Sequence, residues 1–358
     1  MDSTETLLQE LVDAPGVPGH EHEIASIMKN HLETISDEIT YDRLGSLIAA
    51  KKGTADSPRI MVAGHMDEVG FMVKEIDKKG FIKFLPLGGW WGHVVLAQRV
   101  QILTKKGPVL GVVGSTPPHL LKEEERKKVL ELKDMYIDVG AKDGYDVKKN
   151  LGVSVGDAIV PYSPFTIMNH KKMYLAKAFD NRIGCGIVIE LFKKLQRAKH
   201  PNTVLGVGTV QEEVGLRGAG TAAYMGDPDV GIVTDVTVAR DTPGMEGEPP
   251  EKMGSGPQIV VYDGSMIPNV KLRDLVIDTA EKNKIPYGLS YLERGGTDGG
   301  RIHMTKFGVP SIFIGLATRY IHGHASMIYR DDYLNCVKLI TAVVKRLDKK
   351  TVQSLTQV

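Results

Sequence analysis

The sequence has few cysteines, few aromatic residues, almost no net charge and no long apolar run. Its 358 residues include two cysteines, Cys185 and Cys336, which are too few for a disulfide framework and predict a cytoplasmic protein. The 45 basic and 44 acidic residues nearly cancel, so no overall field attracts nucleic acid or an acidic membrane surface. No apolar stretch of about 18 residues occurs, and the amino end lacks a basic segment followed by an apolar one. We therefore expect neither a membrane span nor secretion.

The composition that remains is typical of a globular protein, with 42% hydrophobic and 25% charged residues. The length predicts about two domains. Glycine is abundant, with 39 residues, which exceeds the usual share of about 7%. Many glycines cluster at apparent strand ends, where they permit tight turns and close backbone approach around a site.

The pattern of elements predicts an α/β domain that is interrupted by a β-rich insert. Helical spacing over 4–12 and up to about 35 precedes strand-like segments, and from about 174 helices again alternate with apolar strands. Between them lie short strands at 71–76, 81–85, 94–104 and 109–113 and a β-rich stretch at 153–168. We predict a discontinuous α/β domain over 1–69 and 166–358, with helices on both faces of a mixed sheet, and an insert over 70–165.

Histidine and acidic residues follow the apolar segments at several points. His65 comes directly after the segment 59–64, at the position where open α/β sheets place their sites. Asp67 can accept a hydrogen bond from the imidazole and so strengthen it as a metal ligand. From this pair alone, an ordinary polar loop is the alternative.

Glu212 and Glu213 form the strongest of these signals, because they follow the apolar segment 203–210. Two adjacent carboxylates at such a place repel each other and lose solvation, so a cation should compensate them unless the pair is exposed. Neighbours in extended chain point in opposite directions. One carboxylate can therefore bind a metal ion while the other acts as general base.

The remaining candidate site residues are Asp180, Asp235 and His322. Asp180 stands where a strand gives way to a helix, so helix capping is the favoured interpretation from that segment alone. Asp235 ends the apolar strand 230–234, and His322 follows the strand 311–315. Jointly these residues are typical of a two-metal hydrolase, and their mixed nitrogen and oxygen donors suit Zn, Co or Mn better than Ca.

The motifs around these residues resemble those of the dinuclear metallo-aminopeptidases of the tetrahedral type. Members of that family are called glutamyl or deblocking aminopeptidases and, in older usage, endoglucanases. The motifs occur in the family order over nearly the whole chain, at 63–68, 178–184, 211–218, 234–235, 295–298 and 318–322. Gly323 departs from the pattern, because many members have a small polar residue after the last histidine.

The resemblance implies a role for each residue. The implied metal ligands are His65 and Asp235 for one ion, Glu213 and His322 for the other, and Asp180 for both. Glu212 is implied as the general base and Asp67 as the residue that orients His65. The implied cofactors are two divalent ions, Zn or Co and alternatively Mn.

The resemblance also implies the architecture and the partners. It implies a metallopeptidase α/β fold and a β-barrel-like insert through which relatives assemble into hollow dodecamers. The expected partners are short peptides with a free amino terminus and further copies of this chain, with no nucleic acid or membrane.

Substrate preference stays open between acidic N-terminal residues and leucyl or broad neutral ones. Four arginines are candidate partners for an acidic side chain. Of these, we expect Arg294 to bind substrate, together with Gly295 and Gly296 next to it. The other three are Arg217, Arg240 and Arg319.

Two other function classes fit the sequence less well. A glycosidase works with two carboxyl groups and has no use for the histidines. A catalytically silent assembly protein would be expected to have lost ligands or base. Two further features favour structural roles: the segment 20–23 (HEHE) is interpreted as a polar helix start because it lacks the spacing of a zinc-binding helix, and His324 is expected at the surface.

Overall fold

A mixed nine-stranded sheet lies at the centre of the computed structural model, which describes residues 1–245 and 251–356. The strand order is β1-β2-β12-β3-β13-β17-β15-β16, with β14 paired to β17. The strands β3, β12, β13 and β17 run parallel to one another. In contrast, β2 is antiparallel to β12, and β15 is antiparallel to β17. The bounds are β1 (Glu38–Tyr41), β2 (Leu47–Lys52), β3 (Arg59–His65), β12 (Thr203–Thr209), β13 (Val230–Val233), β14 (Val236–Val238), β15 (Gln258–Tyr262), β16 (Gly288–Tyr291) and β17 (Ser311–Thr318).

Helices cover both faces of this sheet, as the sequence predicts. Successive residues of a strand point to opposite faces, so Ile60 and Val62 of β3 join one core while Met61 and Ala63 join the other. The first core is shared with α1 (Ser3–Asp13), α2 (His22–Leu32), α4 (Phe179–Leu195), α6 (Val270–Lys282), α8 (Arg330–Val344) and α9 (Lys349–Thr356). The second is shared with α5 (Arg217–Gly226) and α7 (Gly299–Ile302). Among the described helices, none is long and apolar enough to cross a membrane.

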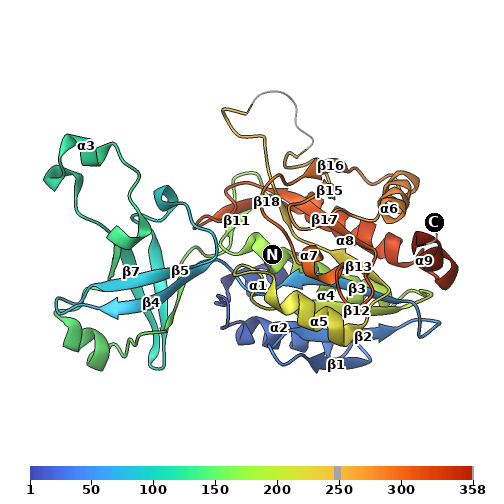
Figure 1. Cartoon of the computed structure of the whole chain (residues 1–358), viewed down its shortest axis with the longest axis horizontal. Coiled ribbons are helices and arrows are strands. Elements are labelled where there is room, and N and C mark those ends of the chain that lie inside the picture. The colour runs from blue at the N-terminus through green and yellow to red at the C-terminus, as the bar shows by residue number, and fades with distance from the viewer. Residues whose placement is uncertain (246–250, 357–358) are drawn as a thin grey trace.

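A closed six-stranded barrel stands to one side of the α/β body (Figure 1). Its strands are β4 (Gly70–Ile76), β5 (Ile82–Leu87), β6 (Arg99–Thr104), β7 (Gly107–Gly114), β8 (Tyr136–Asp138) and β9 (Ala158–Pro161). Phe71, Val100, Ile102 and Ile137 belong to its own apolar core. The barrel-like fold expected for the insert is confirmed, while the boundaries at 70 and 165 stay a prediction.

Short elements connect the barrel strands and join them to the body. The connections are η1 (Gly92–Val94), η2 (Pro118–Leu120), α3 (Glu123–Arg126), η3 (Leu132–Asp134) and η4 (Asp146–Asn150). A three-stranded sheet of β10 (Thr166–Ile167), β11 (Met173–Ala176) and β18 (Ser326–Tyr329) lies at the junction. The predicted strand over 94–104 is wrong in its first half, because η1 ends at Val94 and β6 begins at Arg99.

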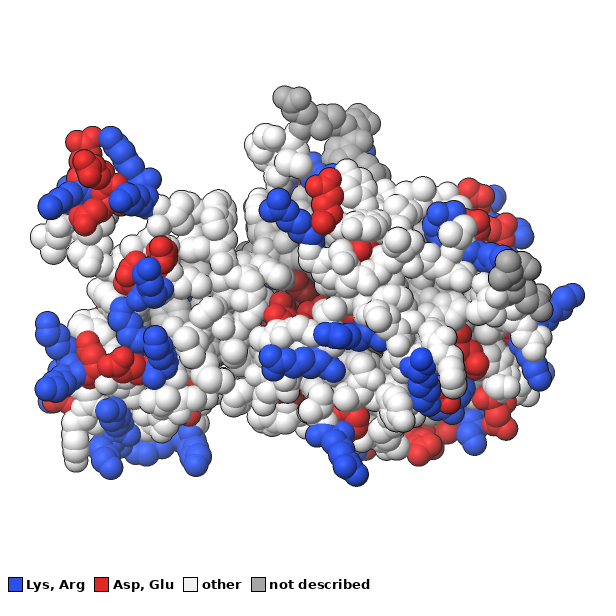
Figure 2. Space-filling model, viewed as in Figure 1, with Lys and Arg blue, Asp and Glu red and all other residues white. Residues whose placement is uncertain are grey.

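The junction of barrel and body contains a hollow with acidic side chains at its base (Figure 2). The barrel begins five residues after β3 ends, so its first strand leaves the body from the carboxyl edge of the sheet. The same edge receives the carboxyl ends of β12, β13 and β17, because these strands run parallel to β3. The fold therefore brings the residues that follow four strands to one place, facing the insert.

Candidate active site

All predicted site residues except Asp67 line one cavity of about 920 Å³ at the carboxyl edge of the sheet. His65 is the last residue of β3, and Asp235 follows β13 by two positions. The cavity wall also contains Gly89, from the insert, so barrel and body both contribute to it. The remaining predicted residues on the wall are Asp180, Glu212, Glu213 and His322. Residues far apart in the sequence thus meet as expected.

Two groups of potential metal donors share Asp180. The first consists of His65, Asp180 and Asp235, and the second of Asp180, Glu213 and His322. One Asp180 oxygen, Oδ1, lies 3.0 Å from His65 Nε2, and Oδ2 lies 3.3 Å from His322 Nε2. Asp235 Oδ2 is 3.8 Å from His65 Nε2, and Glu213 Oε2 is 3.5 Å from His322 Nε2. Each oxygen of Asp180 therefore faces a different donor group.

The site gathers more carboxyl groups than histidines, and burial makes their negative charges unfavourable. Loss of solvation raises the pKa of Glu212, Glu213 and Asp235 well above the usual carboxyl range, and nearby carboxylates raise it further. Burial opposes the charged form of His65, but the surrounding carboxylates, with Glu212 and Asp235 contributing most, together outweigh it and raise the pKa of the imidazole. Glu213 Oε1 is buried without a hydrogen-bond partner among the described residues. An orphaned carboxylate oxygen among nitrogen and oxygen donors fits a divalent transition-metal ion.

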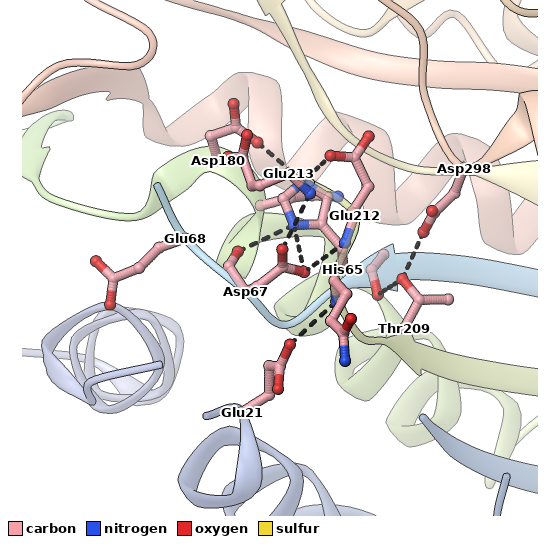
Figure 3. Close-up of polar contacts among 12 residues, drawn as sticks. Glu21, His65, Asp67, Glu68, Asp180, Thr209, Glu212, Glu213 and Asp298 are labelled. Atoms are coloured by element: carbon pink, nitrogen blue, oxygen red, sulfur yellow. Dashed lines mark hydrogen bonds and ion pairs between the residues drawn. The ribbon is translucent and has the colours of Figure 1, made fainter. Parts of the chain in front are cut away.

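Asp67 holds the two neighbouring glutamates through their backbone (Figure 3). Its Oδ1 accepts the N–H of Glu212 and its Oδ2 accepts the N–H of Glu213, both at 3.0 Å. Its carboxylate lies 3.5 Å from His65 Nδ1, whereas its backbone carbonyl lies at 3.0 Å. The orienting of His65 by the Asp67 carboxylate stays a prediction. The sequence did not predict the contact of Asp67 with the loop that carries Glu212 and Glu213, called the glutamate loop below.

Close approach of β3 and α4 brings His65 and Asp180 together. A Cβ on Gly64 would lie 2.7 Å from the Cα of Gly184, so this crossing requires glycine. The capping interpretation of Asp180 is wrong, because its oxygens contact the two imidazoles. Asn181 accepts the Gly184 N–H at 3.0 Å instead.

Arg294, Gly295 and Gly296 line the cavity, and their contact with substrate stays a prediction. The other candidate arginines have different partners. Arg319 forms two hydrogen bonds to Asp241, at 2.8 and 2.7 Å. The remaining two also have partners: Arg240 contacts Tyr291 and Glu251, and Arg217 donates to Gln211.

Several residues near the site were not expected from the sequence. Asp298 accepts a hydrogen bond from Thr209, the last residue of β12, and burial raises the pKa of Asp298 to about 6. His324 is buried rather than at the surface, and contacts the carbonyl of Arg99 in the barrel. Glu21, from the segment interpreted as a polar helix start, contacts the backbone of the glutamate loop.

A buried ion cluster lies behind the site. Glu68 Oε1 is 2.6 Å from Lys177 Nζ and 3.3 Å from Arg182 Nη2. The two cations also donate to the backbone carbonyls of Leu11, Ala14 and Gly16. The cluster thus fastens the segment after α1 against the start of α4.

A model of the M42 glutamyl aminopeptidase family matches residues 45–339. The chain belongs to the M42 family. A second model, AMPT, matches residues 2–28. Membership in M42 makes the protein a hydrolase of the aminopeptidase type and implies divalent metal ions, for which the two donor groups are the matching residues.

M42 relatives cover nearly the whole chain. The putative aminopeptidase FrvX of Escherichia coli strain K12 is 42% identical over 98% of both chains. The glutamyl aminopeptidase of Lactococcus lactis is 33% identical over 97% of this chain and 98% of its own. The lysyl aminopeptidase of Pyrococcus furiosus is 34% identical over 95% of this chain and 96% of its own. Relatives of similar identity therefore carry names with opposite substrate charge.

Solved structures of TET peptidases have the same fold. The TET aminopeptidase of the Thaumarchaeota archaeon SCGC AB-539-E09 matches with a TM-score of 0.96 at 46% identity, covering 99% of both chains. The TET1 peptidase of Pyrococcus horikoshii, described as assembling into a tetrahedron or an octahedral shell, matches with a TM-score of 0.84 at 29% identity. That match covers 96% of this chain and 100% of the other.

Proposed function

We propose that this M42 protein removes N-terminal residues from short peptides with the help of two divalent metal ions. The observation that carries the proposal is the pair of donor groups that share Asp180 and face one cavity. His65 and Asp235 would hold one ion, Glu213 and His322 the other, and Asp180 both. When bound, such ions supply a Lewis acid for the scissile carbonyl and lower the pKa of water towards neutrality.

Glu212 is proposed as the general base. It belongs to neither donor group among the described residues, yet its Oε2 lies on the same wall, 3.8 Å from His65 Nε2. In the proposed reaction the attacking water forms a C–O bond and loses a proton to Glu212. The peptide C–N bond then breaks, and Glu212 passes the proton to the leaving amine.

The cavity wall supports a preference for an acidic N-terminal residue. Arg294 is the one candidate arginine of the four that lines the cavity in the described structure, and a guanidinium can bind a carboxylate with two hydrogen bonds. A leucyl or neutral preference is the second candidate. It is favoured by the apolar side chains on the same wall, which include Val238, Leu292 and Ile321.

Self-association into a homo-oligomer, with a dodecamer as the expected form, is part of the proposal. The named assemblies of similar TET peptidases support it. Exposed apolar side chains on the barrel also support it, because Leu110 is 54% and Val112 42% exposed on β7. Contiguous exposed apolar surface marks interaction sites. The insert over 70–165 would provide the contacts, and the assembly would work in the cytoplasm.

Cleavage of chromogenic amino-acid amides tests the proposal. Glu, Asp, Leu, Lys and Ala amides would be compared, with cellulose oligomers alongside, after chelation and after addition of Zn or Co. We expect cleavage of amides that chelation abolishes and added metal restores, and no cleavage of the oligomers. Silence on every amide at full metal content would reject the peptidase function.

A further inference from the structure

Glu21 contacts the loop that carries the two adjacent glutamates (Figure 3). It directly precedes α2, and its side chain is 5% exposed. Its Oε1 accepts the backbone N–H of Gly19 at 2.8 Å and that of Gln211 at 3.0 Å. The second contact joins residues 190 positions apart in the sequence. A carboxylate from the start of the chain thus touches the residue just before Glu212.

Two carboxylates together bind three consecutive backbone N–H groups of this loop. Glu21 binds that of Gln211, and Asp67 binds those of Glu212 and Glu213. Gln211 has a φ of 56°, in the left-handed region, which costs about 1 kcal/mol or more for a residue other than glycine. Such a turn lets successive N–H groups face nearby anions, and here the anions are two side chains of the protein itself.

The carbonyl side of the loop is also held. Gln211 O accepts the N–H of Arg217, and Glu212 O accepts those of Gly215 and Leu216. The donors of these bonds lie in the turn that leads into α5. None of these bonds uses the N–H of Gln211, which Glu21 accepts. The orientation of the peptide between β12 and Glu212 therefore depends on a contact from outside the sheet.

The described residues that line the cavity do not include Glu21, so it acts through Gln211 rather than on the substrate. Its own position is set by the segment that follows α1. Glu68 Oε1 accepts the N–H of Gly16, and Arg182 donates to the carbonyl of Gly16. The buried ion cluster thus fixes the turn from which Glu21 reaches the loop.

We propose that Glu21 is a positioning residue for the hydrolytic reaction. By accepting the Gln211 N–H it keeps that residue left-handed and sets the directions in which the side chains of Glu212 and Glu213 leave the backbone. This inference rests on the proposed roles of those two glutamates. A misplacement of about 1 Å in reacting groups can cost about 100-fold in rate.

Three variants test the role in the full-length, metal-loaded protein. Glu21→Ala should lower kcat about 10- to 100-fold with little change in KM. Glu21→Gln should recover most of the activity, because its amide oxygen can accept both N–H groups. Glu23→Ala is the matched control, because Glu23 is an exposed acidic residue and the second residue of α2. Its kcat and KM should be unchanged. A loss in Glu21→Gln as large as in Glu21→Ala would overturn the hydrogen-bond argument.

Binding of cobalt(II) gives a readout that does not depend on turnover. Titration of the metal-free protein, followed by visible absorption, should show about tenfold weaker binding of one ion in Glu21→Ala. If Glu21 only stabilises the fold, the unfolding midpoint falls while cobalt binding and kcat per folded molecule stay at the wild-type values, which overturns the proposal. If Glu21→Ala does not fold, Glu21→Asp replaces it, because its side chain is shorter by one methylene. Glu21→Asp should show the same fall in kcat and the same weaker cobalt binding.

The two readouts also separate this proposal from the proposed function. If the wild-type protein cleaves no amide, the peptidase function fails. The cobalt titration still decides whether Glu21 positions the glutamate loop.

Discussion

At the scale of single residues, the site depends on differences between neighbours. Glu212 and Glu213 are adjacent, yet Glu213 faces His322 and Asp180 while Glu212 faces His65. The sequence argument expects this separation from the alternation of side chains in an extended chain. In the structure the two glutamates enter a turn after the left-handed Gln211, so the separation arises from that turn. The hold of Glu21 on Gln211 could not be predicted, because no local pattern shows which backbone N–H a distant carboxylate will reach.

Glu212→Gln and Glu213→Gln should fail in different ways. Glu212→Gln keeps both donor groups but removes the proton acceptor, so kcat should fall by about 100-fold or more at unchanged metal stoichiometry. Glu213→Gln removes a donor, so bound metal should fall as well. Metal analysis beside kcat measures both. Equal metal loss in the two variants would contradict the separation of roles.

Arg294→Gln should alter substrate preference without abolishing hydrolysis. Arg294 lies on the cavity wall and belongs to neither donor group, so loss of its guanidinium should lower kcat/KM for the Glu amide about tenfold and leave that for the Leu amide nearly unchanged. Arg319→Gln is the comparison, because Arg319 is bound to Asp241. A uniform loss on both amides would remove Arg294 from the specificity role.

At the scale of elements, strand ends and close crossings place the donors. The parallel strands could be predicted from their apolar runs, and with them the meeting of His65, Asp235 and His322 at one edge. The helix α5 was not predicted, because its glycines weaken the helical signal. The burial of His324 was also not predicted. It results from contact with the carbonyl of Arg99, which lies in a strand of the barrel.

Gly64→Ala should loosen the crossing of β3 and α4. The added Cβ meets backbone atoms of Gly184, which cannot move without shifting the helix, so we expect a loss of about 1–3 kcal/mol in the free energy of unfolding. Metal affinity should fall too, because Asp180 moves with α4. Gly220→Ala in α5 is the control, since its Cβ would meet nothing closer than 3.9 Å. Denaturant unfolding and metal titration would detect both effects, and an unchanged Gly64→Ala protein would contradict the close crossing.

At the scale of the whole molecule, the barrel forms one rim of the cavity and presents apolar strands outward. The fold class could be predicted because the insert interrupts the helix–strand alternation with closely spaced short strands. Its closure into a barrel could be expected only from the family resemblance, because strand order depends on pairing between distant segments such as β4 and β9.

The double variant Leu110→Glu/Val112→Glu should reduce the size of the assembly. Both side chains point outward from β7, so the charges would be buried only in a contact between copies. Light scattering should show the wild type as an oligomer and the variant as smaller species. The thermal unfolding midpoint of the dissociated subunit checks that the barrel remains folded. An unchanged mass would exclude this face of β7 from the contacts.

The proposed donors are spread from His65 to His322, and the last of them follows the central strand β17. Almost the entire chain must therefore be synthesised and leave the ribosome before all of the donors can meet in the cavity. Nascent chains, and products cut short before Ser311, lack both the His322 imidazole and the strand that places it. The order of synthesis would therefore delay hydrolysis at the proposed site until almost the whole chain has been made.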